Sequence, residues 1–412
     1  MNLYFHPSPK PYVKPASKYL RLGVDSRKRG VELLEKLIPN ILPGSFTPVC
    51  PDHERKDRGI ILHVDGAGSK PIISYLCYKE FGESGWFEGL AQDVLAMNID
   101  DVIAMAAQPI LFADYIAINP IKLSKEQVLD ELSRGFAKTL ETLTELQGEF
   151  RIAPAFAGGE TADLPDQMRT LDIAGALFAI LDLDKAPRQA ELKDGDLIIG
   201  LESGGRASYE HKENSGIMCN GISLARHVLL KREYLERYPE IGEPGIKEAY
   251  SGRLSLDDYI EELDMTLAEA LLSPTRIYAP IIAEILTKNP NTIKLMCHNT
   301  GGGLTKSLRL GKGVRYVKDG LPEPNPIFKL IQSEGRIDWR EMYEVFNMGV
   351  GFELIVEKEY ADDLIQIAEK YHVAARVIGR IELLKEPMNE VIVKSRYGVF
   401  SYRRMLEERH SV

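Results

Sequence analysis

The stretch ILHVDGAGSKP, residues 61–71, decides the fold, because an apolar run ends there in glycines and a Ser-Lys pair. Such a run predicts a strand followed by a tight turn. Gly66 and Gly68 lack a Cβ, so their backbone can approach an anion closely, and Lys70 can place a positive charge on phosphate oxygens. Asp65, at the strand end, can hold a cation that bridges those oxygens. A tight turn with a solvated lysine is the alternative, since the spacing is not that of a Walker A loop.

The composition indicates a globular enzyme of roughly two to three domains. The chain has 412 residues, of which 44% are hydrophobic and 27% charged, and its net charge is -10. The acidic balance argues against a nucleic-acid partner, since phosphate backbones are bound by clustered Lys and Arg. No apolar run approaches the roughly 20 residues that span a bilayer. The four cysteines form no C-x-x-C pair. We therefore expect a cytoplasmic protein with no membrane contact and no disulfide framework.

Strands and helices alternate along the chain. The clearest helix is predicted over residues 124–148, where Ser124 and Gln127 form a capping box and apolar residues recur at steps of three and four. Ser273-Pro274 is predicted to start another helix, with proline at its favoured first position. A polar segment, residues 184–195, separates two domains that each mix strands and helices. Apolar runs predict strands at residues 59–66, 168–181, 195–203, 292–298, 314–320, 350–357 and 375–383.

Two segments lie outside this pattern. Residues 206–216, RASYEHKENSG, are polar enough to form a mobile surface loop. The final stretch from about residue 385 predicts an appended strand and helix.

An acidic helix is predicted over AQDVLAMNIDDVIAM, residues 91–105. Asp93 and Asp100 are two turns apart on nearly the same face, with Asp101 beside them. The other positions are mostly apolar, so these acids would be buried, and an unpaired buried carboxylate is costly. Mg²⁺ is one compensation, because it prefers hard oxygen ligands. Helix caps or salt bridges to Lys and Arg are the alternative, and the pattern alone does not choose between them.

Two more glycine-rich segments carry polar groups. FAGGETADLPD, residues 156–166, predicts a strand that ends in a tight loop presenting Glu160 and Thr161. CHNTGGGLTKSL, residues 297–308, places three glycines before a predicted helix, whose exposed amides can bind an anion. A flexible hinge is the alternative for these glycines. Together with the acidic helix, the two phosphate-type loops suggest an enzyme that uses ATP and Mg²⁺.

Seven blocks occur in a specific order along the chain: VDGAGSK, DVLAMNIDDV, AGGETAD, CNGISLAR, SPTRIYAP, HNTGGG and EMYEVFNMGVGFEL. Together they resemble the phosphoribosylformylglycinamidine cyclo-ligase family, also called AIR synthetase, from about Tyr19 to Ile381. The first and third blocks are shared across the wider PurM-like superfamily. The PTRIY, TGGG and FNMGVG blocks point more narrowly to AIR synthetase.

The resemblance implies an α+β fold of PurM-like two-domain architecture. The N-terminal α+β domain would pair its sheet with that of a second copy in a homodimer, and ATP would lie near that interface. The C-terminal domain would be of the α/β type. The expected divisions are an N-terminal extension (1–18), an ATP-binding domain (19–185), a C-terminal domain (193–382) and a C-terminal extension (383–412).

The resemblance also implies a reaction. ATP phosphorylates the amide oxygen of formylglycinamidine ribonucleotide, a neighbouring amidine nitrogen attacks the activated carbon, and phosphate leaves as the imidazole ring of 5-aminoimidazole ribonucleotide closes. Making the oxygen part of a phosphate turns a poor leaving group into a good one. Two alternatives stay open: a PurM-like kinase or activating enzyme with another substrate, and a non-catalytic ATP-binding paralogue.

Site roles are implied by the same resemblance, residue by residue. Lys70, Asp93, Asn220 and His211 are the expected catalytic residues. Magnesium would be bound by Asp65, Asp93, Asp100, Asp101 and Glu160, and ATP by Asp65, Gly66, Gly68, Ser69, Lys70, Gly159, Glu160 and Thr161. The ribonucleotide would be bound by Asn220, Gly221, Thr300, Gly301, Gly302 and Gly303.

The chain departs from the family pattern in two places. Many relatives carry a histidine just before the Ser-Asn-Gly turn, and Met218 stands at that position here. His211, in the longer preceding loop, is the candidate substitute, with a solvated loop histidine as the alternative. The remaining candidates are His63, His227 and His298. IPNILPGSFTPVCPD, residues 38–52, keeps one glycine where relatives are glycine-rich, so the cover over ATP is expected to differ.

Overall fold

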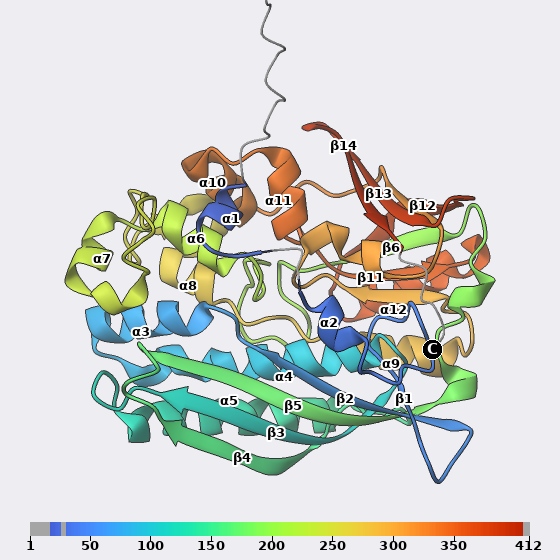
Figure 1. The fold of residues 1–412 in the computed structure, drawn as a ribbon, viewed down its shortest axis with the longest axis horizontal. Coiled ribbons are helices and arrows are strands. Elements are labelled where there is room, and N and C mark those ends of the chain that lie inside the picture. Colours follow the sequence, from blue (N-terminus) through green and yellow to red (C-terminus); the bar gives the residue numbers. More distant parts are fainter. Residues whose placement is uncertain (1–16, 26–29, 407–412) are drawn as a thin grey trace, which may run out of the picture.

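Two sheets, formed by successive parts of the chain, organise the structure (Figure 1). The computed structural model describes residues 17–25 and 30–406. The first sheet lies at the bottom of the view and the second, mostly orange and red, at the upper right. Most of the predicted N-terminal extension lies outside the described residues. Two short helices, α1 (Lys18–Arg21) and α2 (Glu32–Glu35), precede the first sheet.

The first sheet has the strand order β1-β2-β5-β3-β4. Neighbouring strands are antiparallel except β3 and β4, which are parallel. Burial alternates along β5, so Ile173 and Leu177 face the core while Ala174 and Phe178 face away. The strands are β1 (Cys50–Pro51), β2 (Arg58–Gly66), β3 (Gln108–Ile118), β4 (Ala155–Asp163) and β5 (Leu171–Asp182).

Three helices cover one face of this sheet: α3 (Lys70–Phe81), α4 (Glu88–Ile103) and α5 (Lys125–Leu146). The predicted start of α5 is confirmed, because the Ser124 side chain accepts a hydrogen bond from the Gln127 backbone N–H (3.4 Å). α4 is buried along most of its length, since α5 and the first sheet flank it and the second domain also packs against it. The predicted acidic helix is therefore the central helix of the molecule.

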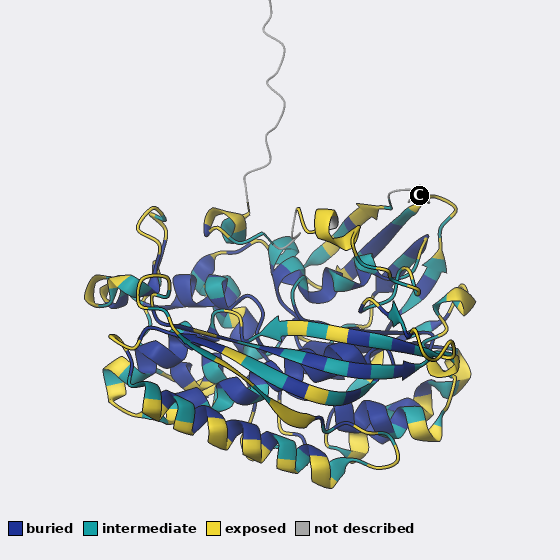
Figure 2. Ribbon diagram, turned by 60° about the horizontal axis from the view of Figure 1, so that its bottom comes forward, coloured by how far each residue is buried: buried dark blue, intermediate teal, exposed yellow. Residues whose placement is uncertain are grey.

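The opposite face of the first sheet is open and apolar. Leu62 and Val64 on β2 are 70% and 65% exposed, and Leu111 on β3 is 44% exposed. Strand pairing places Phe178 of β5 between Leu62 and Leu111. Exposed residues on these strands are visible in yellow in Figure 2. A contiguous apolar face of this kind marks an interaction surface.

The second sheet has the order β14-β13-β10-β12-β6-β11-β9, and each strand predicted in this half from an apolar run is confirmed. Its strands are β6 (Leu197–Glu202), β9 (Leu295–His298), β10 (Val314–Lys318), β11 (Val350–Val356), β12 (Ala375–Leu383), β13 (Met388–Ser395) and β14 (Gly398–Met405). β7 (Tyr259–Ile260) and β8 (Met265–Thr266) form a separate two-stranded ribbon. The helices are α6 (Ile222–Leu229), α7 (Arg232–Arg237), α8 (Leu267–Leu272), α9 (Ala279–Lys288), α10 (Pro326–Gly335), α11 (Trp339–Val345) and α12 (Ala361–Lys370).

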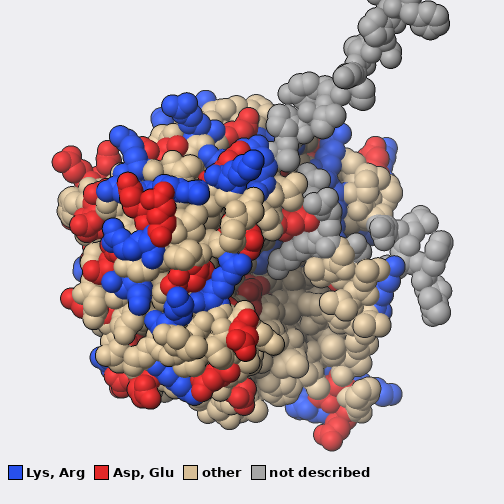
Figure 3. Space-filling view, turned by 60° about the vertical axis from the view of Figure 1, so that its left-hand side comes forward, with Lys and Arg blue, Asp and Glu red and all other residues tan. Residues whose placement is uncertain are grey.

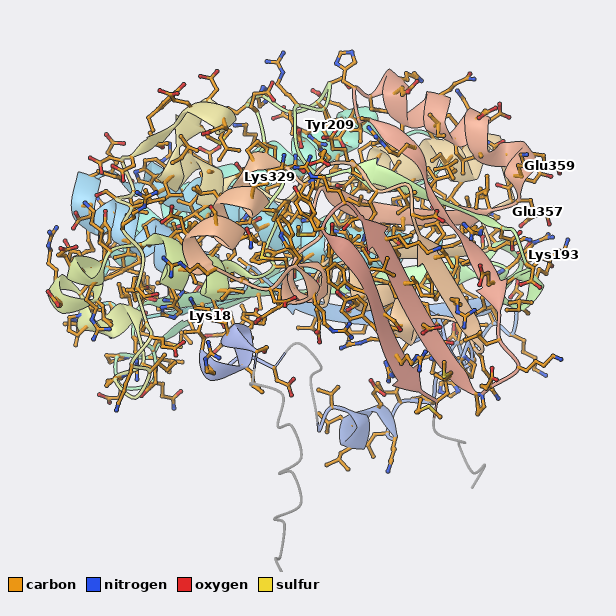
Figure 4. All side chains as sticks on the ribbon, turned by 90° about the horizontal axis from the view of Figure 1, so that it is seen from above. Lys18, Lys193, Tyr209, Lys329, Glu357 and Glu359 are labelled. Atoms are coloured by element: carbon orange, nitrogen blue, oxygen red, sulfur yellow. The ribbon has the colours of Figure 1, made fainter. Side chains whose placement is uncertain are left out.

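The chain passes from the first sheet to the second through residues 183–196. Within this connection, Lys193 pairs with Glu357 (3.0 Å), and Lys294 pairs with the same carboxylate (3.0 Å). Figure 4 shows Lys193 and Glu357 together at one end of the molecule. None of the helices in the described part of the chain combines the length and the apolar character that crossing a bilayer requires.

The prediction that a helix begins at Ser273-Pro274 is wrong. α8 ends at Leu272, and α9 begins only at Ala279. Between them, the backbone N–H groups of Thr275 and Tyr278 donate to carboxylates of α4 and not to helix carbonyls. Contacts distant in sequence therefore override the local proline signal.

The glycine-rich segments also differ in detail from the expectation. β4 does not end at its glycines but continues to Asp163, with Gly158 at a φ of 109°. The helix predicted after the three consecutive glycines is a 3-10 helix, η6 (Gly303–Arg309).

The predicted C-terminal strand and helix are a hairpin of two strands, β13 and β14. Asn389 on β13 is fully buried and fastens the hairpin to the segment that follows η6. Its Nδ2 donates to the carbonyls of Leu308 (3.1 Å), Leu310 (2.9 Å) and Gly311 (3.2 Å), and its Oδ1 accepts from the Val314 N–H (3.0 Å). One side chain therefore pairs with four backbone groups between the end of η6 and the start of β10.

We expect the close approach of α5 to α4 to depend on Gly135. A Cβ at this position would overlap the Glu88 carbonyl oxygen and lie 2.9 Å from the Ala91 Cβ. Gly135→Ala should lower the free energy of unfolding by about 1–3 kcal/mol, the usual cost of overpacking. Gly148→Ala is the matched control, because nothing lies within 4 Å of a Cβ there. Equal urea midpoints for the two variants would contradict this account.

Candidate active site

Three loops that are distant in sequence meet between the two domains: residues 66–69, 219–223 and 299–303. The Ser69 and Ser223 hydroxyls are 2.9 Å apart, which joins the first loop to the second. Asn220 Nδ2 donates to the Asn299 carbonyl (3.5 Å), which joins the second loop to the third. The phosphate-type loops predicted from sequence therefore lie at one place in the fold.

Two glycines make this convergence possible. Gly68 has a φ of +60°, and a Cβ there would lie 3.1 Å from the Cys219 carbonyl oxygen. Gly221 has a φ of +70°, and a Cβ there would overlap the ring of Phe346. Both positions favour glycine for their backbone conformation, and Gly221 also for lack of space.

A buried network of hydrogen bonds supports the third loop. The Lys318 ammonium donates to Glu353 (2.6 Å) and to the Leu304 carbonyl (2.8 Å). Asn299 Nδ2 donates to the same carboxylate oxygen (2.7 Å). All three polar side chains are fully buried, so the start of η6 and Asn299 are held in a fixed relation.

The first acid of α4, Asp93, forms a buried ion pair with Lys70. Its Oδ1 accepts from the Lys70 ammonium (2.7 Å) and from the Thr275 N–H and hydroxyl (both 2.7 Å). Lys70 also donates to the Ser273 carbonyl (2.6 Å) and is 0% exposed. The lysine expected at ATP phosphates is therefore enclosed between α4 and residues 273–275 of the second domain.

The second acid, Asp100, caps a helix of the other domain. Its two oxygens accept from the backbone N–H groups of Tyr278 (2.8 Å) and Ala279 (2.9 Å), at the beginning of α9. Burial raises the pKa of Asp100 well above its usual range, although these two donors oppose the shift. The alternative of caps and salt bridges, left open by the sequence, thus applies to both Asp93 and Asp100.

The third acid, Asp101, lies in a cluster drawn from both domains. His298 Nδ1 is 2.7 Å from its Oδ1, while His63 Nε2 and the Lys306 ammonium are 3.3 Å and 3.6 Å from its Oδ2. Burial alone would raise the pKa of Asp101, but Lys306 and the two imidazoles outweigh it and hold this pKa well below the usual range. Lys306 also contacts the Thr300 hydroxyl of the third loop.

Asp65 brings a second carboxylate to this cluster. Among the residues that the structure describes, His63, Asp65 and Asp101 form a group whose ligand atoms all lie within 4.8 Å of one another. Burial, followed by the charge of Asp101, raises the pKa of Asp65. A divalent cation would relieve that repulsion, and the donor set of carboxylate oxygens fits one.

The GGETA segment does not reach this cluster within one chain. Gly159, Glu160 and Thr161 lie on the edge strand β4, and Glu160 is exposed. Strand pairing lines Glu160 up with Tyr115 of β3, Ala174 of β5 and Gly66 of β2. Three strand spacings separate Glu160 from β2, about 14 Å. Glu160 therefore does not share a cation with Asp65 of its own chain.

The position that aligns with the family histidine, just before Cys219-Asn220-Gly221, holds no titratable group. Met218 is fully buried against Gly351, with a φ of 58°. His211 is exposed and lines a cavity of about 600 Å³ between α4, α5 and α8, whose wall includes Asp93 but not Asp101. His227 is buried beside Tyr250. His63 and His298 are the imidazoles at the cluster.

The loop of residues 206–216, predicted to be mobile, is fastened at several points. Arg276 is fully buried and pairs with Glu210 (2.7 Å), and it also donates to the carbonyls of Gly204 and Gly205. The Tyr209 hydroxyl donates to the Ile277 carbonyl (2.6 Å). The PTRIY segment therefore organises this loop.

The sequence did not predict Lys306 or Thr275 at the site, and it indicated His63 only as one candidate for the missing family histidine. His63 had a usable signal, because it stands two residues before Asp65 in a predicted strand and side chains repeat with a period of two. Lys306 and Thr275 had no such signal in the sequence. Their partners, Asp101 and Asp93, lie about two turns apart on α4, which is far away in sequence.

Surface charge gives no sign of a nucleic-acid site on the face over α3 and α7. Basic and acidic side chains are interleaved there, and a hollowed, uncharged area adjoins them (Figure 3). Nucleic-acid interfaces instead need a continuous basic tract.

Comparisons with known proteins agree on one family. Models of AIR synthase related proteins match residues 50–181 (N-terminal domain) and 193–386 (C-terminal domain). The chain is 35% identical over 340 residues to a phosphoribosylformylglycinamidine cyclo-ligase of Methanocaldococcus jannaschii, covering 82% of this chain and 83% of the relative. A relative of the same name from Methanococcus maripaludis is 34% identical over 352 residues, covering 85% and 86%.

Solved structures share the fold. The structure of T. maritima PurL complexed with FGAR has a TM-score of 0.51 and 14% identity, covering 90% of this chain and 49% of that chain. A chain of a HypE-HypF complex has a TM-score of 0.50 and 14% identity, covering 92% and 98%. At these identities the likeness concerns the fold alone.

We expect the Lys70–Asp93 pair to stabilise the fold. Asp93→Asn leaves the Lys70 ammonium buried without a counter-charge, which should lower the free energy of unfolding by about 3–5 kcal/mol. Adding Lys70→Met removes that charge and should recover part of the loss, as a double-mutant cycle would measure. Asp57→Asn, which breaks the exposed Arg55–Asp57 pair, is the control and should change stability little. A full-length Asp93→Asn protein of unchanged stability would contradict this role.

Proposed function

This chain belongs to the AIR synthase family, and we propose that it performs its cyclo-ligase reaction at the cluster and loops between its two domains. The activity is the ATP-dependent cyclisation of formylglycinamidine ribonucleotide to 5-aminoimidazole ribonucleotide in purine biosynthesis. The observation that carries the location is the meeting of three glycine-containing loops beside Asp65 and Asp101.

In this reaction the protein chiefly positions the reacting groups and neutralises their charge. The amide oxygen of the substrate attacks the γ-phosphorus of ATP, and ADP leaves. The amidine nitrogen then attacks the activated carbon, the C–O bond breaks, and inorganic phosphate leaves with the former amide oxygen. Both steps move negative charge onto phosphate oxygens, so cations and backbone N–H groups near the loops lower the barrier.

Asp65 and Asp101 are the proposed ligands of Mg²⁺. When bound, the ion neutralises charge on the ATP phosphates. His298 donates from Nδ1 to Asp101 and so fixes the orientation of that carboxylate. Lys306, whose side chain is 14% exposed, lies next to Asp101 and Thr300 and places a further positive charge at the third loop.

The ribonucleotide is assigned to the second and third loops. Gly301 and Gly302 are half-buried, and a Cβ on Gly301 would lie 3.9 Å from Asn220 Oδ1, so a ligand can contact both loops at once. Lys70, Asp93 and Asp100 receive another role in this proposal: they hold the second domain against α4.

The partner is proposed to be a second copy of this chain. The open face of the first sheet, with Leu62, Val64 and Leu111 exposed, would be buried when two such faces pair. We propose that pairing also brings Glu160 to the cluster of the partner, since it lies too far from Asp65 of its own chain.

The activity is tested with purified protein, formylglycinamidine ribonucleotide, ATP and Mg²⁺, following aminoimidazole formation and ADP release. We expect both products in equal amounts, and Asp101→Asn should lower turnover at least about tenfold through weaker cation binding. ADP without aminoimidazole would indicate a PurM-like kinase or activating enzyme with another substrate. ATP binding without ADP release would indicate a non-catalytic paralogue.

Dimer formation is tested by placing a charge on the open face. Val64→Lys should shift the protein from dimer to monomer in sedimentation velocity, because a lysine would be buried against the apolar partner face. Ile121→Lys is the control: Ile121 is 80% exposed but lies outside the strands of the sheet. If the unmodified protein sediments as a monomer, the proposed interface is wrong.

A mixing experiment tests which chain of the dimer supplies Glu160 to each site. Two inactive variants, Asp65→Asn and Glu160→Gln, are dissociated reversibly and mixed. If Glu160 serves the partner, a mixed dimer contains one site with both carboxylates, and activity should reappear. If each Glu160 serves its own chain, every site in the mixed dimer keeps one defect and activity stays absent.

A further inference from the structure

His63 occupies a distinctive position in the cluster. It lies on β2 two residues before Asp65, and its side chain is 15% exposed. One ring nitrogen, Nδ1, is 3.0 Å from Asn98 Oδ1, and the other, Nε2, is 3.3 Å from Asp101 Oδ2. Asn98 is on α4 and fully buried, so the contacts on both sides of the ring are held by one helix.

The hydrogen bonds of Asn98 determine which ring nitrogen carries the proton. Asn98 Nδ2 donates to the carbonyls of Val94 (2.9 Å) and Asp65 (3.1 Å), which uses both of its protons. Its Oδ1 is therefore an acceptor, and His63 Nδ1 must donate to it. In the neutral ring, Nε2 then carries a lone pair directed at Asp101.

Two acceptors thus face each other across 3.3 Å, which requires a positive species between or on them. A second ring proton is one solution and a metal ion is the other. The distance is longer than the roughly 2.7–2.9 Å of a charge-assisted hydrogen bond. His298, in contrast, reaches the other oxygen of Asp101 at 2.7 Å. The pairing of Nδ1–H with an amide oxygen is also the outer-shell arrangement typical of metal-binding histidines.

We propose that His63 is a nitrogen ligand of the divalent cation that Asp65 and Asp101 hold, and that Asn98 orients its ring. This inference rests on the proposed function, because that function brings a divalent cation to these carboxylates. An imidazole is a softer ligand than carboxylate or water. The site should therefore favour Mn²⁺ over Mg²⁺ more strongly than an all-oxygen site would.

His298 does not serve as the nitrogen ligand in this arrangement. Its Nδ1 is committed to Asp101, and its Nε2 points toward Asp100, at 4.0 Å from Oδ2. The ring is fully buried between Tyr278 and Phe352. His63 is the imidazole whose free nitrogen faces the two carboxylates.

The test is pulsed EPR of the full-length protein loaded with Mn²⁺, without nucleotide. The unmodified protein should show ¹⁴N coupling to the ion. His63→Asn should abolish this coupling, because the Asn amide can replace Nδ1–H as donor to Asn98 but has no group at the Nε2 position. The affinity for Mn²⁺ should fall at least about tenfold, since losing even an outer-shell partner costs that much. The affinity for Mg²⁺ should fall by less, because Mg²⁺ depends less on a nitrogen ligand. His53→Asn, on an exposed turn, is the control and should leave the coupling unchanged.

Two results would overturn the assignment. Mn²⁺ binding without ¹⁴N coupling, together with unchanged affinities in His63→Asn, would mean that His63 carries a second proton. Coupling that persists in His63→Asn would assign the nitrogen to another residue. Turnover is measured separately: coupling that His63→Asn abolishes, in a protein that forms no aminoimidazole, would support the ligand and reject the proposed function.

Discussion

The attachment of α4 to residues 273–279 is the constraint on which the rest of the structure depends. Asp93 binds Lys70 and Thr275, and Asp100 binds the first N–H groups of α9. These carboxylates are buried, so each needs its partners to offset the cost of desolvation. The relation of the two domains is thereby specified by charged hydrogen bonds, which are more directional than apolar contacts.

The cluster at Asp101 forms because the two domains are held in this relative position. His63 and Asp65 come from the first sheet, whereas His298 and Lys306 come from the second domain. The distances between these groups therefore depend on the relative position of the two domains. Along a single helix, the first two acids therefore hold the domains together, and the third is the proposed ligand of the divalent cation.

Much of the fold follows from local sequence signals, because strand alternation and helix caps depend on neighbouring residues. The start of α5 at Ser124 and the apolar run of β2 are examples. The different tasks of Asp93, Asp100 and Asp101 could not be predicted, since all three are acids of one apolar helix. What separates them is the residue opposite, such as Thr275 or His298, which is close to 200 positions away. The edge position of β4, which carries Glu160, likewise depends on strand order.

The hydrogen bonds of Asn389 have a consequence for where this protein can be truncated. The matched family region ends at residue 386, yet Asn389 supports the backbone that leads out of η6 and hence the exit from the third loop. A C-terminal segment outside the matched family region thus supports the backbone that follows the third loop. Fragments for crystallisation or fusion should retain the hairpin. Removing it would also remove the buried Asn389 side chain and its hydrogen bonds to the backbone between η6 and β10.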